Sequence, residues 1–459
     1  MTDTADTRAR TALARRPWKQ AACWLAFLAP FFYLSYGVAN HLAAQQAEVP
    51  SVVFAWEHRI PFIDWTIFPY WSINVFYGLS LFLCRSRDEV HTHGRRLLSA
   101  QLVAVTCFIL FPLTFSFGQP AASGASAVLF DALRGFDKPF NQAPSLHIAL
   151  LVILWDLYRR LLPRTWHWLL HLWSLAIGVS VLTTYQHHFI DIPTGALLGL
   201  CCLWLWPMDA PAPMRNAALA RDPRRWRLAA YYALGSALCF ALAGLGAARH
   251  GAALWLCWPA VALGFVAAHY AFFGAHGFQK TSDGRLSLAA RWLFAPYRAG
   301  AWLNSRLWTR GQAPAVPVTL PAHAAPARLW LGRMPTAAQA RALGIAAIVD
   351  VCAELPAPAT VPTRSVPMLD LIPPQTDALR AAADAIEAQL DATQADGGKV
   401  LVCCALGYSR SAAAVAAWML RYGHASDADA AIAQLRAARP QLVLYDEHRL
   451  ALAALMVTS

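Results

Sequence analysis

Charged residues are scarce in this chain of 459 residues: they make up 14% of it, against 58% hydrophobic residues. That balance excludes an ordinary soluble protein and indicates that most of the chain sits in lipid. The ten cysteines are scattered, several of them inside apolar runs, and show no paired spacing. We therefore expect free thiols rather than a disulfide framework or a zinc site.

Acidic residues are also few, with 26 against 38 lysines and arginines, for a formal net charge of +12. On a membrane protein a basic excess marks the cytoplasmic face more often than nucleic-acid binding, so no nucleic-acid partner is predicted. The polar, Arg-rich residues 1–19 precede an apolar run longer than the core of a cleavable signal peptide. We expect this run to be a retained first span.

Eight apolar runs are long enough to cross a bilayer, which takes about 20 residues. They lie at residues 20–44, 60–84, 97–117, 144–162, 166–185, 187–207, 227–248 and 252–274. Arginine-rich stretches occupy every second connection, so the positive-inside rule places the N-terminus and everything after the eighth run in the cytoplasm. We predict an all-α, multi-pass bundle in the inner membrane, with the C-terminal part cytoplasmic.

The composition changes after His276. Residues 279–310 are basic and amphipathic, which suits either a helix on the membrane surface or an ordinary helical linker, and residues 311–327 form a Pro/Ala linker. The predicted domains follow from these changes. They are a six-span membrane domain at 1–210, two further spans at 211–275, an amphipathic segment and linker at 276–326, and a soluble α/β domain at 327–459.

In the tail, short buried strands alternate with helices. The pattern predicts strands at 328–332, 345–352, 363–371 and 397–404, and helices at 336–344 and 376–393, the second capped by Thr376 or Asp377. Strands that alternate with helices imply a largely parallel central sheet covered on both sides.

The stretch "CALGYSRS" carries Cys404 and Arg410 between the last predicted strand and an alanine-rich helix. The backbone N–H groups of such a loop and the helix N-terminus would cradle a phosphate dianion, and the arginine would grip two of its oxygens. The same positive field favours a thiolate nucleophile at Cys404. The phosphate-binding residues are predicted to be Ala405, Leu406, Gly407, Tyr408, Ser409 and Arg410.

With the strand and helix patterns around it, this loop resembles the dual-specificity branch of the cysteine-based phosphatases. The resemblance implies a phosphocysteine at Cys404, phosphate binding by Arg410 and assistance from Ser411 as the thiolate departs. The family's general acid matches Asp370 best, with Asp377 as the alternative. The family usually has histidine before the nucleophile, where this chain has Cys403.

Two histidine clusters stand at the starts of predicted spans. "PSLH" holds His147, and "QHHFIDIP" holds His187, His188 and Asp191. Ionisable residues within spans are costly, so each is a candidate for function. His187 and Asp191 are four apart on one helix face, so the carboxylate can orient the imidazole; spacing alone does not exclude His188.

These motifs resemble the type 2 phosphatidic acid phosphatase superfamily, especially its branch of inositol phosphorylceramide and sphingomyelin synthases. The resemblance implies a phosphohistidine at His187, orientation by Asp191 and protonation of the leaving alcohol by His147. The family's phosphate-binding arginine is missing, which favours the transferase-like branch and leaves Lys138 or Arg134 as substitutes.

The whole resembles a bacterial fusion of two phosphate-handling domains that need no metal or cofactor. The first hypothesis is a phosphatase of lipid phosphates outside and of a phosphoprotein or lipid phosphate inside. The loop between Cys404 and Arg410 has no lysine or arginine, so a polyphosphoinositide is the less favoured substrate. The alternatives are a lipid-headgroup phosphotransferase with a separate tail phosphatase, and a protein in which one half is a non-catalytic phosphate sensor.

Overall fold

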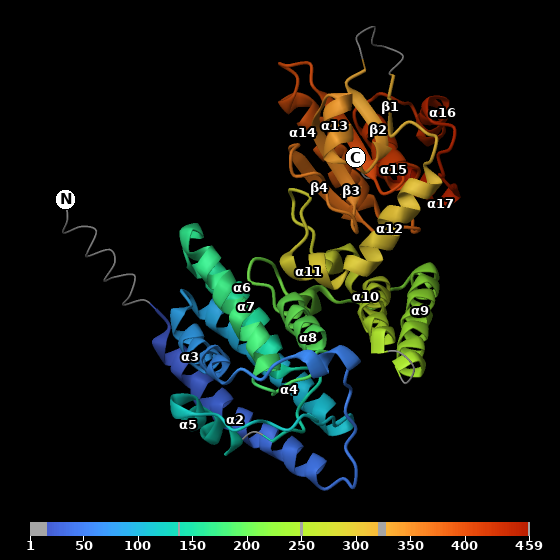
Figure 1. Cartoon of the computed structure of the whole chain (residues 1–459). Coiled ribbons are helices and arrows are strands. Elements are labelled where there is room, and N and C mark those ends of the chain that lie inside the picture. Colours follow the sequence, from blue (N-terminus) through green and yellow to red (C-terminus); the bar gives the residue numbers. More distant parts are fainter. Residues whose placement is uncertain (1–15, 136–137, 248–250, 320–326, 458–459) are drawn as a thin grey trace, which may run out of the picture. The chain divides into compact units, whose positions relative to one another are not determined.

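A computed structural model describes residues 16–135, 138–247, 251–319 and 327–457 (Figure 1). The chain divides into two compact units. The first is Met1–Arg215 with Leu242–Trp255, and the second is Asn216–Ala241 with Leu256–Ser459. Each unit has its own core, and each holds one of the two predicted sites.

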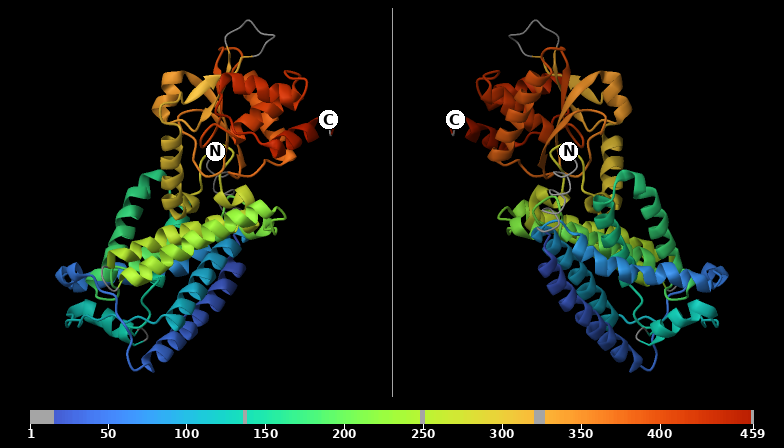
Figure 2. Two further views of the ribbon diagram at one scale, coloured as in Figure 1. Left: turned by 90° about the vertical axis from the view of Figure 1, so that its right-hand side faces the viewer. Right: turned by 90° about the vertical axis from the view of Figure 1, so that its left-hand side faces the viewer.

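The first unit, blue to green in Figures 1 and 2, is built from helices. Six of them overlap the first six predicted runs: α2 (Trp18–Ala44), α3 (Ile67–Leu83), α4 (Arg87–Leu110), α6 (Leu146–Leu161), α7 (His167–Thr183) and α8 (Asp191–Leu205). Helix α5 (Gly124–Arg134) and the 3-10 turns η1 (Ala55–Arg59), η2 (Asp64–Thr66) and η3 (Arg164–Trp166) are additional to those runs.

The sequence predicts eight membrane spans, but fewer helices have the length and composition of a span. Within the described ranges, five do so: Trp18–Ala44, Asp64–Leu83, Arg164–Thr183, Pro223–Ala247 and Gly251–Phe278. Helix α4 fails because it begins with the charged stretch "RDEVHTHGRR". Helices α6 and α8 have 16 and 15 residues, so each is under about 25 Å long against a hydrocarbon thickness of about 30 Å.

Helix α8 packs very closely on α6 because it carries glycines on the contact face. A Cβ at Gly195 would lie 2.4 Å from the carbonyl oxygen of Ser145, and one at Gly199 would lie 2.8 Å from that of Ala149. Ser145 begins α6, where its hydroxyl accepts from the Ile148 N–H, and its own N–H donates to the carbonyl of Asp191 at 3.2 Å. The packing therefore brings the "PSLH" and "HHFID" motifs together.

The second unit begins with helices and ends in an α/β domain. Its helical part contains α9 (Pro223–Ala247) as far as Ala241, α10 (Cys257–Ala268), the π-helix η6 (His269–Phe273), η7 (Gly274–Phe278), α11 (Leu288–Leu293) and α12 (Ala295–Trp308). Helices α11 and α12 fall within the segment 279–310 that the sequence marks as amphipathic.

The α/β domain contains a five-stranded sheet in the order β1-β2-β5-β3-β4. The strands are β1 (Ala315–Pro317), β2 (Leu329–Arg333), β3 (Ile345–Cys352), β4 (Thr363–Met368) and β5 (Lys399–Cys404). All neighbouring pairs are parallel except β1 with β2, which confirms the predicted largely parallel sheet. Strand β1 corrects the prediction of a featureless linker: Val316 lies opposite Leu331 at the sheet edge, where a strand ending in proline is tolerated.

Five helices accompany this sheet: α13 (Ala337–Leu343), α14 (Thr376–Ala392), α15 (Arg410–Arg421), α16 (Ala428–Ala438) and α17 (Asp446–Val457). Gly344 closes α13 in a left-handed conformation with φ of 66°, as predicted. The predicted cap of α14 is wrong. The N-cap is Gln375, without a side-chain hydrogen bond, and Asp377 lies in the first turn.

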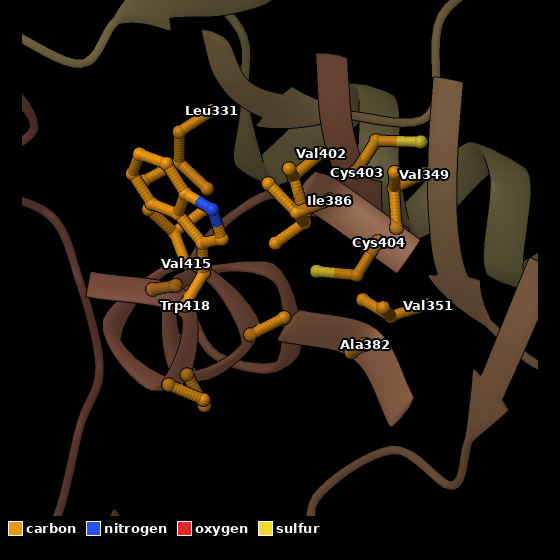
Figure 3. Close-up of a cluster of buried hydrophobic side chains, with 14 of the residues drawn as sticks. Leu331, Val349, Val351, Ala382, Ile386, Val402, Cys403, Cys404, Val415 and Trp418 are labelled. Carbon is orange, nitrogen blue, oxygen red and sulfur yellow. The ribbon is translucent and has the colours of Figure 1, made fainter. Parts of the chain in front are cut away.

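The core of the domain lies between the sheet and helices α14 and α15 (Figure 3). Val349 and Val402 from the strands meet Ile386 and Val415 from the helices, and all four are fully buried. The alanines of α15 are also fully buried. Small side chains at these positions allow the helix to approach the sheet closely, which fixes the position of its first residue, Arg410.

Candidate active sites

The cysteine loop joins the end of β5 to the start of α15. Cys404 is 2% exposed, and its sulfur lies 3.3 Å from the Ser411 hydroxyl and 3.2 Å from the Gly407 nitrogen, which donates to it. Gly407 has φ of 77°, and a Cβ there would lie 2.3 Å from the backbone of Gly332. Only glycine fits this turn, so the loop is held against β2 with the Gly407 N–H aimed at the thiol.

Arg410 is 1% exposed and lies between two acidic residues. Its two terminal nitrogens donate to the two carboxylate oxygens of Glu354 at 2.8 and 2.7 Å, and one of them lies 3.0 Å from Asp370. The guanidinium also donates to the carbonyl of Met368 at 3.0 Å. The sequence prediction missed Glu354. The available clue was a single carboxylate directly after a buried parallel strand, at the sheet edge where Cys404 also lies.

The two acidic residues have opposite pKa shifts. Burial acts to raise the pKa of Glu354, but the charge and hydrogen bonds of Arg410 outweigh it and hold this pKa below its usual value. Burial raises the pKa of Asp370, with the negative charge of Glu354 adding to it and Arg410 opposing. When the pKa values of two neighbouring carboxyl groups are shifted apart in this way, the group with the lowered pKa stays a carboxylate and the group with the raised pKa can carry a proton. Asp370 is therefore the better candidate for a general acid.

The alternative acid, Asp377, lies elsewhere. Its side chain is 94% exposed and pairs with Arg380 at 3.1 Å. A solvated carboxylate on the first turn of a helix is an ordinary surface feature. The geometry brings Cys404, Arg410, Ser411 and Asp370 together and leaves Asp377 out.

Cys403 occupies the position where the dual-specificity family usually has histidine. It is fully buried, its sulfur lies 3.9 Å from the sulfur of Met334, and burial raises its pKa well above the usual value. Figure 3 shows the sulfurs of Cys403 and Cys404 pointing away from each other, as expected for neighbours on a strand. Cys403 is thus a neutral packing residue.

Lys280 gives a second correction to the sequence prediction. It belongs to the segment expected on the membrane surface or in a linker, yet its ammonium is fully buried in an ion pair with Asp350 of β3. It also donates to the carbonyls of Cys352 and Leu355, each at 2.5 Å. These two carbonyls bracket Glu354, so Lys280 fixes the turn from which Glu354 reaches Arg410.

The second site is formed by the two histidine motifs in the first unit. Nδ1 of His187 lies 3.1 Å from a carboxylate oxygen of Asp191, and Nε2 lies 3.1 Å from the hydroxyl of Ser145. A carboxylate only accepts, so Nδ1 carries the proton and Nε2 presents its lone pair. All three side chains are buried.

His188, which spacing alone left open, has different surroundings. The backbone N–H of Ser116 donates to its Nε2 at 3.2 Å, so Nδ1 carries the proton that is donated to Glu57 at 3.0 Å. Both ring nitrogens are thus used to join three segments of the unit. His187 is the better candidate nucleophile.

A cavity of about 230 Å³ adjoins His187. His147 also lines it, stacks on Tyr70 with ring centroids 4.1 Å apart, and has a buried Nε2 without a hydrogen-bond partner in the described part of the chain. The other lining residues are mainly apolar or aromatic, and none is lysine or arginine. Neither Lys138 nor Arg134 lines the cavity, and Arg134 pairs with Asp131 instead.

Among the residues that the structure describes, no group of three or more His, Cys, Asp or Glu side chains is placed to hold a metal ion. The nucleophile candidates are side chains, and the positive charge at the cysteine site comes from Arg410.

Several solved structures are similar to about a third of this chain or less. Human DUSP28 is 26% identical, covering 32% of this chain and 95% of that one, with a TM-score of 0.26. Tk-PTP in its active form is 24% identical over 29% of this chain and 95% of that one, with a TM-score of 0.25. PTPMT1 in complex with PI(5)P is 19% identical over 28% and 90%, with a TM-score of 0.25.

No curated protein matched the chain. Among protein families, residues 329–456 match the dual specificity phosphatase catalytic domain. The match spans β2 to α17 and includes Cys404, Arg410, Ser411 and Asp370. The histidine site, in the first unit, lies outside the matched residues. Residues 329–456 of this chain are a dual-specificity phosphatase catalytic domain.

Proposed function

We propose that this protein is a membrane-bound phosphatase whose cysteine site hydrolyses phosphate monoesters. The observation that carries the proposal is the arrangement of Arg410, fully buried between Glu354 and Asp370, beside a thiol that accepts a loop N–H. A dianionic phosphate needs fixed donors of this kind, and a planar guanidinium binds two of its oxygens at once.

The reaction would proceed in two steps. The Cys404 thiolate attacks phosphorus, the bond from phosphorus to the alcohol oxygen breaks, and the Asp370 carboxyl donates its proton to that oxygen. Water then attacks the phosphocysteine, giving its proton to the Asp370 carboxylate, and the sulfur departs as a thiolate. Ser411, 3.3 Å from the sulfur, is placed to donate to the departing thiolate.

Cys404→Ser tests this mechanism in the full-length protein. It should abolish hydrolysis of an aryl phosphate, and Cys403→Ser is the matched control because its sulfur points away from that of Cys404 and is buried beside Met334. An unchanged rate in Cys404→Ser would exclude the cysteine as nucleophile.

The proposal also includes a bilayer location, which five apolar helices support. We place the N-terminus and the phosphatase domain on the cytoplasmic side, because arginines concentrate in the connections assigned to that side. Cysteine-accessibility labelling of exposed positions in both units tests this assignment. Labelling of exposed positions near residues 187 and 404 from the same compartment would contradict it.

A second phosphate-handling site at His187 completes the proposal. The His187 lone pair would attack phosphorus, Asp191 would hold the imidazole, and His147 would protonate the leaving alcohol. Its support is that His187 and His147, 40 residues apart in sequence, line one cavity. The absence of lysine and arginine from that lining favours transfer from a singly charged phosphodiester lipid to an alcohol over hydrolysis of a dianion.

His187→Ala, compared with His188→Gln, tests the second site. Released phosphate from phosphatidate would indicate hydrolysis, whereas a headgroup recovered on a new alcohol would indicate transfer. If His187→Ala changes neither, the first unit is a sensor or scaffold and the histidine proposal fails.

A further inference from the structure

The loop that carries Asp370 is tied to the apolar helices of its own unit. The hydroxyl of Tyr270, in the π-helix η6, donates to the carbonyl of Asp370 at 3.1 Å. Arg225, at the start of α9, donates to the carbonyl of Tyr270 at 2.8 Å. Tyr270 and Arg225 both belong to helices that are long and apolar enough to cross a membrane. The backbone of the candidate general acid is therefore held by Tyr270, which Arg225 links to the start of α9.

Aromatic rings from three helices border the catalytic carboxylates. Tyr232 of α9 stacks on Tyr270 with centroids 5.4 Å apart and meets Tyr297 of α12 edge-on at 5.8 Å. Burial raises the pKa of Tyr297 well above its usual value, and the nearby negative charges of Glu354 and Asp370 add to this. These helices thus form part of the wall of the phosphatase site.

Two cavities lie on either side of the acid loop. One, of about 930 Å³, is bounded by residues 216–225, 272–276 and 367–378. The other, of about 560 Å³, is lined by Arg224, Arg227, Leu371 and residues 444–447, which include Asp446 and Glu447. Each has helix-end residues on one wall and residues flanking Asp370 on the other. Both are large enough for a lipid headgroup with its glycerol portion.

The helix ends are basic. The stretch "RDPRRWR" at 221–227 holds four arginines and one aspartate. Arg224 pairs with Glu447, whereas Arg221 and Arg227 are exposed and form no ion pair within the described residues. Arginines next to an apolar helix attract anionic headgroups at a membrane surface.

The residue after Asp370 also faces outward. Leu371 is 68% exposed and has φ of 59°, a conformation that leucine rarely adopts. Strain of this kind persists only where the surroundings impose it and is concentrated at functional sites. An exposed leucine beside arginines and apolar helices suits contact with acyl chains better than contact with water.

We propose that the cysteine site takes the phosphate monoester headgroup of a membrane lipid, drawn from the bilayer surface beside α9 and η6, and not a phosphoprotein. The proposal rests on the proposed function, since it needs both an active Cys404 and a bilayer around the helices. The phosphate would enter the loop of Cys404, while Arg221 and Arg227 attract the anionic headgroup. Because residues 405–409 include no lysine or arginine, a lipid with a single phosphate fits best.

The test uses the full-length His187→Ala protein in nanodiscs, so that the histidine site does not contribute. Phosphate release is measured from phosphatidate in the nanodisc, from a phosphotyrosine peptide and from an aryl phosphate. We expect kcat/KM for phosphatidate to exceed that for the peptide. The double variant Arg221→Gln with Arg227→Gln should lower the ratio of phosphatidate to aryl phosphate hydrolysis about 20-fold, the combined effect of two surface arginines.

Arg341→Gln is the matched control, because Arg341 is an exposed arginine on helix α13 of the same unit; it should leave the ratio unchanged. Faster hydrolysis of the peptide than of phosphatidate, or an unchanged ratio in the double variant, would overturn the inference. Failure of the proposed function looks different: aryl phosphate hydrolysis would then survive Cys404→Ser in the His187→Ala protein.

Discussion

The cysteine loop and the histidine cavity differ in the charge that their walls provide. At the first, Arg410 is a fixed cation held by Glu354 and Asp370. At the second, His187 and His147 share a cavity lined mainly by aliphatic and aromatic side chains, without lysine or arginine. A dianionic monoester suits the first environment, and a singly charged diester suits the second. Under the proposed function, substrate charge divides phosphate chemistry between the two sites.

The largest effect is expected from Arg410→Lys. Lysine keeps the charge but loses the planar fork, so phosphate oxygens and the Glu354 carboxylate can no longer be held in the same geometry. Hydrolysis of an aryl phosphate should fall about 10³-fold or more. Steady-state kinetics on the purified protein measures this. The His187-dependent activity is the internal control, and an equal loss there would show that the variant had simply unfolded.

Asp370→Asn should lower kcat for an aryl phosphate about 10²- to 10³-fold. Because burial raises the pKa of Asp370, its acid form persists to higher pH than that of an ordinary carboxyl group. Activity that needs this proton should therefore hold until pH reaches the raised pKa and fall above it. A pH profile of kcat measures this fall in activity at high pH, and the fall should be absent in Asp370→Asn. If kcat of the variant still falls at the same high pH, another group supplies the proton.

Lys280→Met should destabilise the second unit by about 3–5 kcal/mol, because it leaves Asp350 buried without a partner. Denaturant unfolding of the detergent-solubilised protein, followed by tryptophan fluorescence, measures the change. Lys280→Met combined with Asp350→Leu should recover most of the lost stability, since the unpaired charge is gone. A single variant as stable as the parent protein would mean that the pair does not hold the turn of Glu354.

The smallest effect is expected from Asp377→Asn. Its exposed carboxylate pairs only with Arg380, so kcat for an aryl phosphate should stay within about twofold of the parent value. Measured beside Asp370→Asn, this variant identifies which aspartate acts. A loss as large as that of Asp370→Asn would reverse the assignment.

Local pattern was enough to predict the strand, loop and helix around Cys404, because each depends on neighbours in sequence. Asp370 was proposed from the family resemblance, although the strand predicted at 363–371 included it, and β4 ends at Met368 just before it. Glu354 and Lys280 were missed because their roles depend on contacts between residues 56 and 72 apart in the chain. No periodicity records such contacts, and a lone lysine in a basic segment resembles a surface residue.

Prediction of the membrane half from sequence was limited in the same way. Apolar runs located the helices, but run length alone overstated how many suit a bilayer, because α6 and α8 are shorter than the runs that predicted them. The spacing of His187 and Asp191 predicted that they share one helix face, but α8 begins at Asp191 and His187 lies in the loop before it. The two side chains still lie 3.1 Å apart. The roles of Glu57 and Ser116 in occupying His188 required the folded chain, since they come from distant segments.

The most direct test of the account is the identity of the phosphorylated residues. The full-length Cys404→Ser protein is mixed with a phosphodiester lipid and the full-length His187→Ala protein with a lipid phosphate monoester. Each is quenched rapidly and mapped by mass spectrometry, under conditions that preserve phosphorus–histidine and phosphorus–sulfur bonds respectively. We predict a phosphoryl group on His187 in the first protein and on Cys404 in the second. A phosphoryl group on neither residue, while turnover continues, would contradict the account.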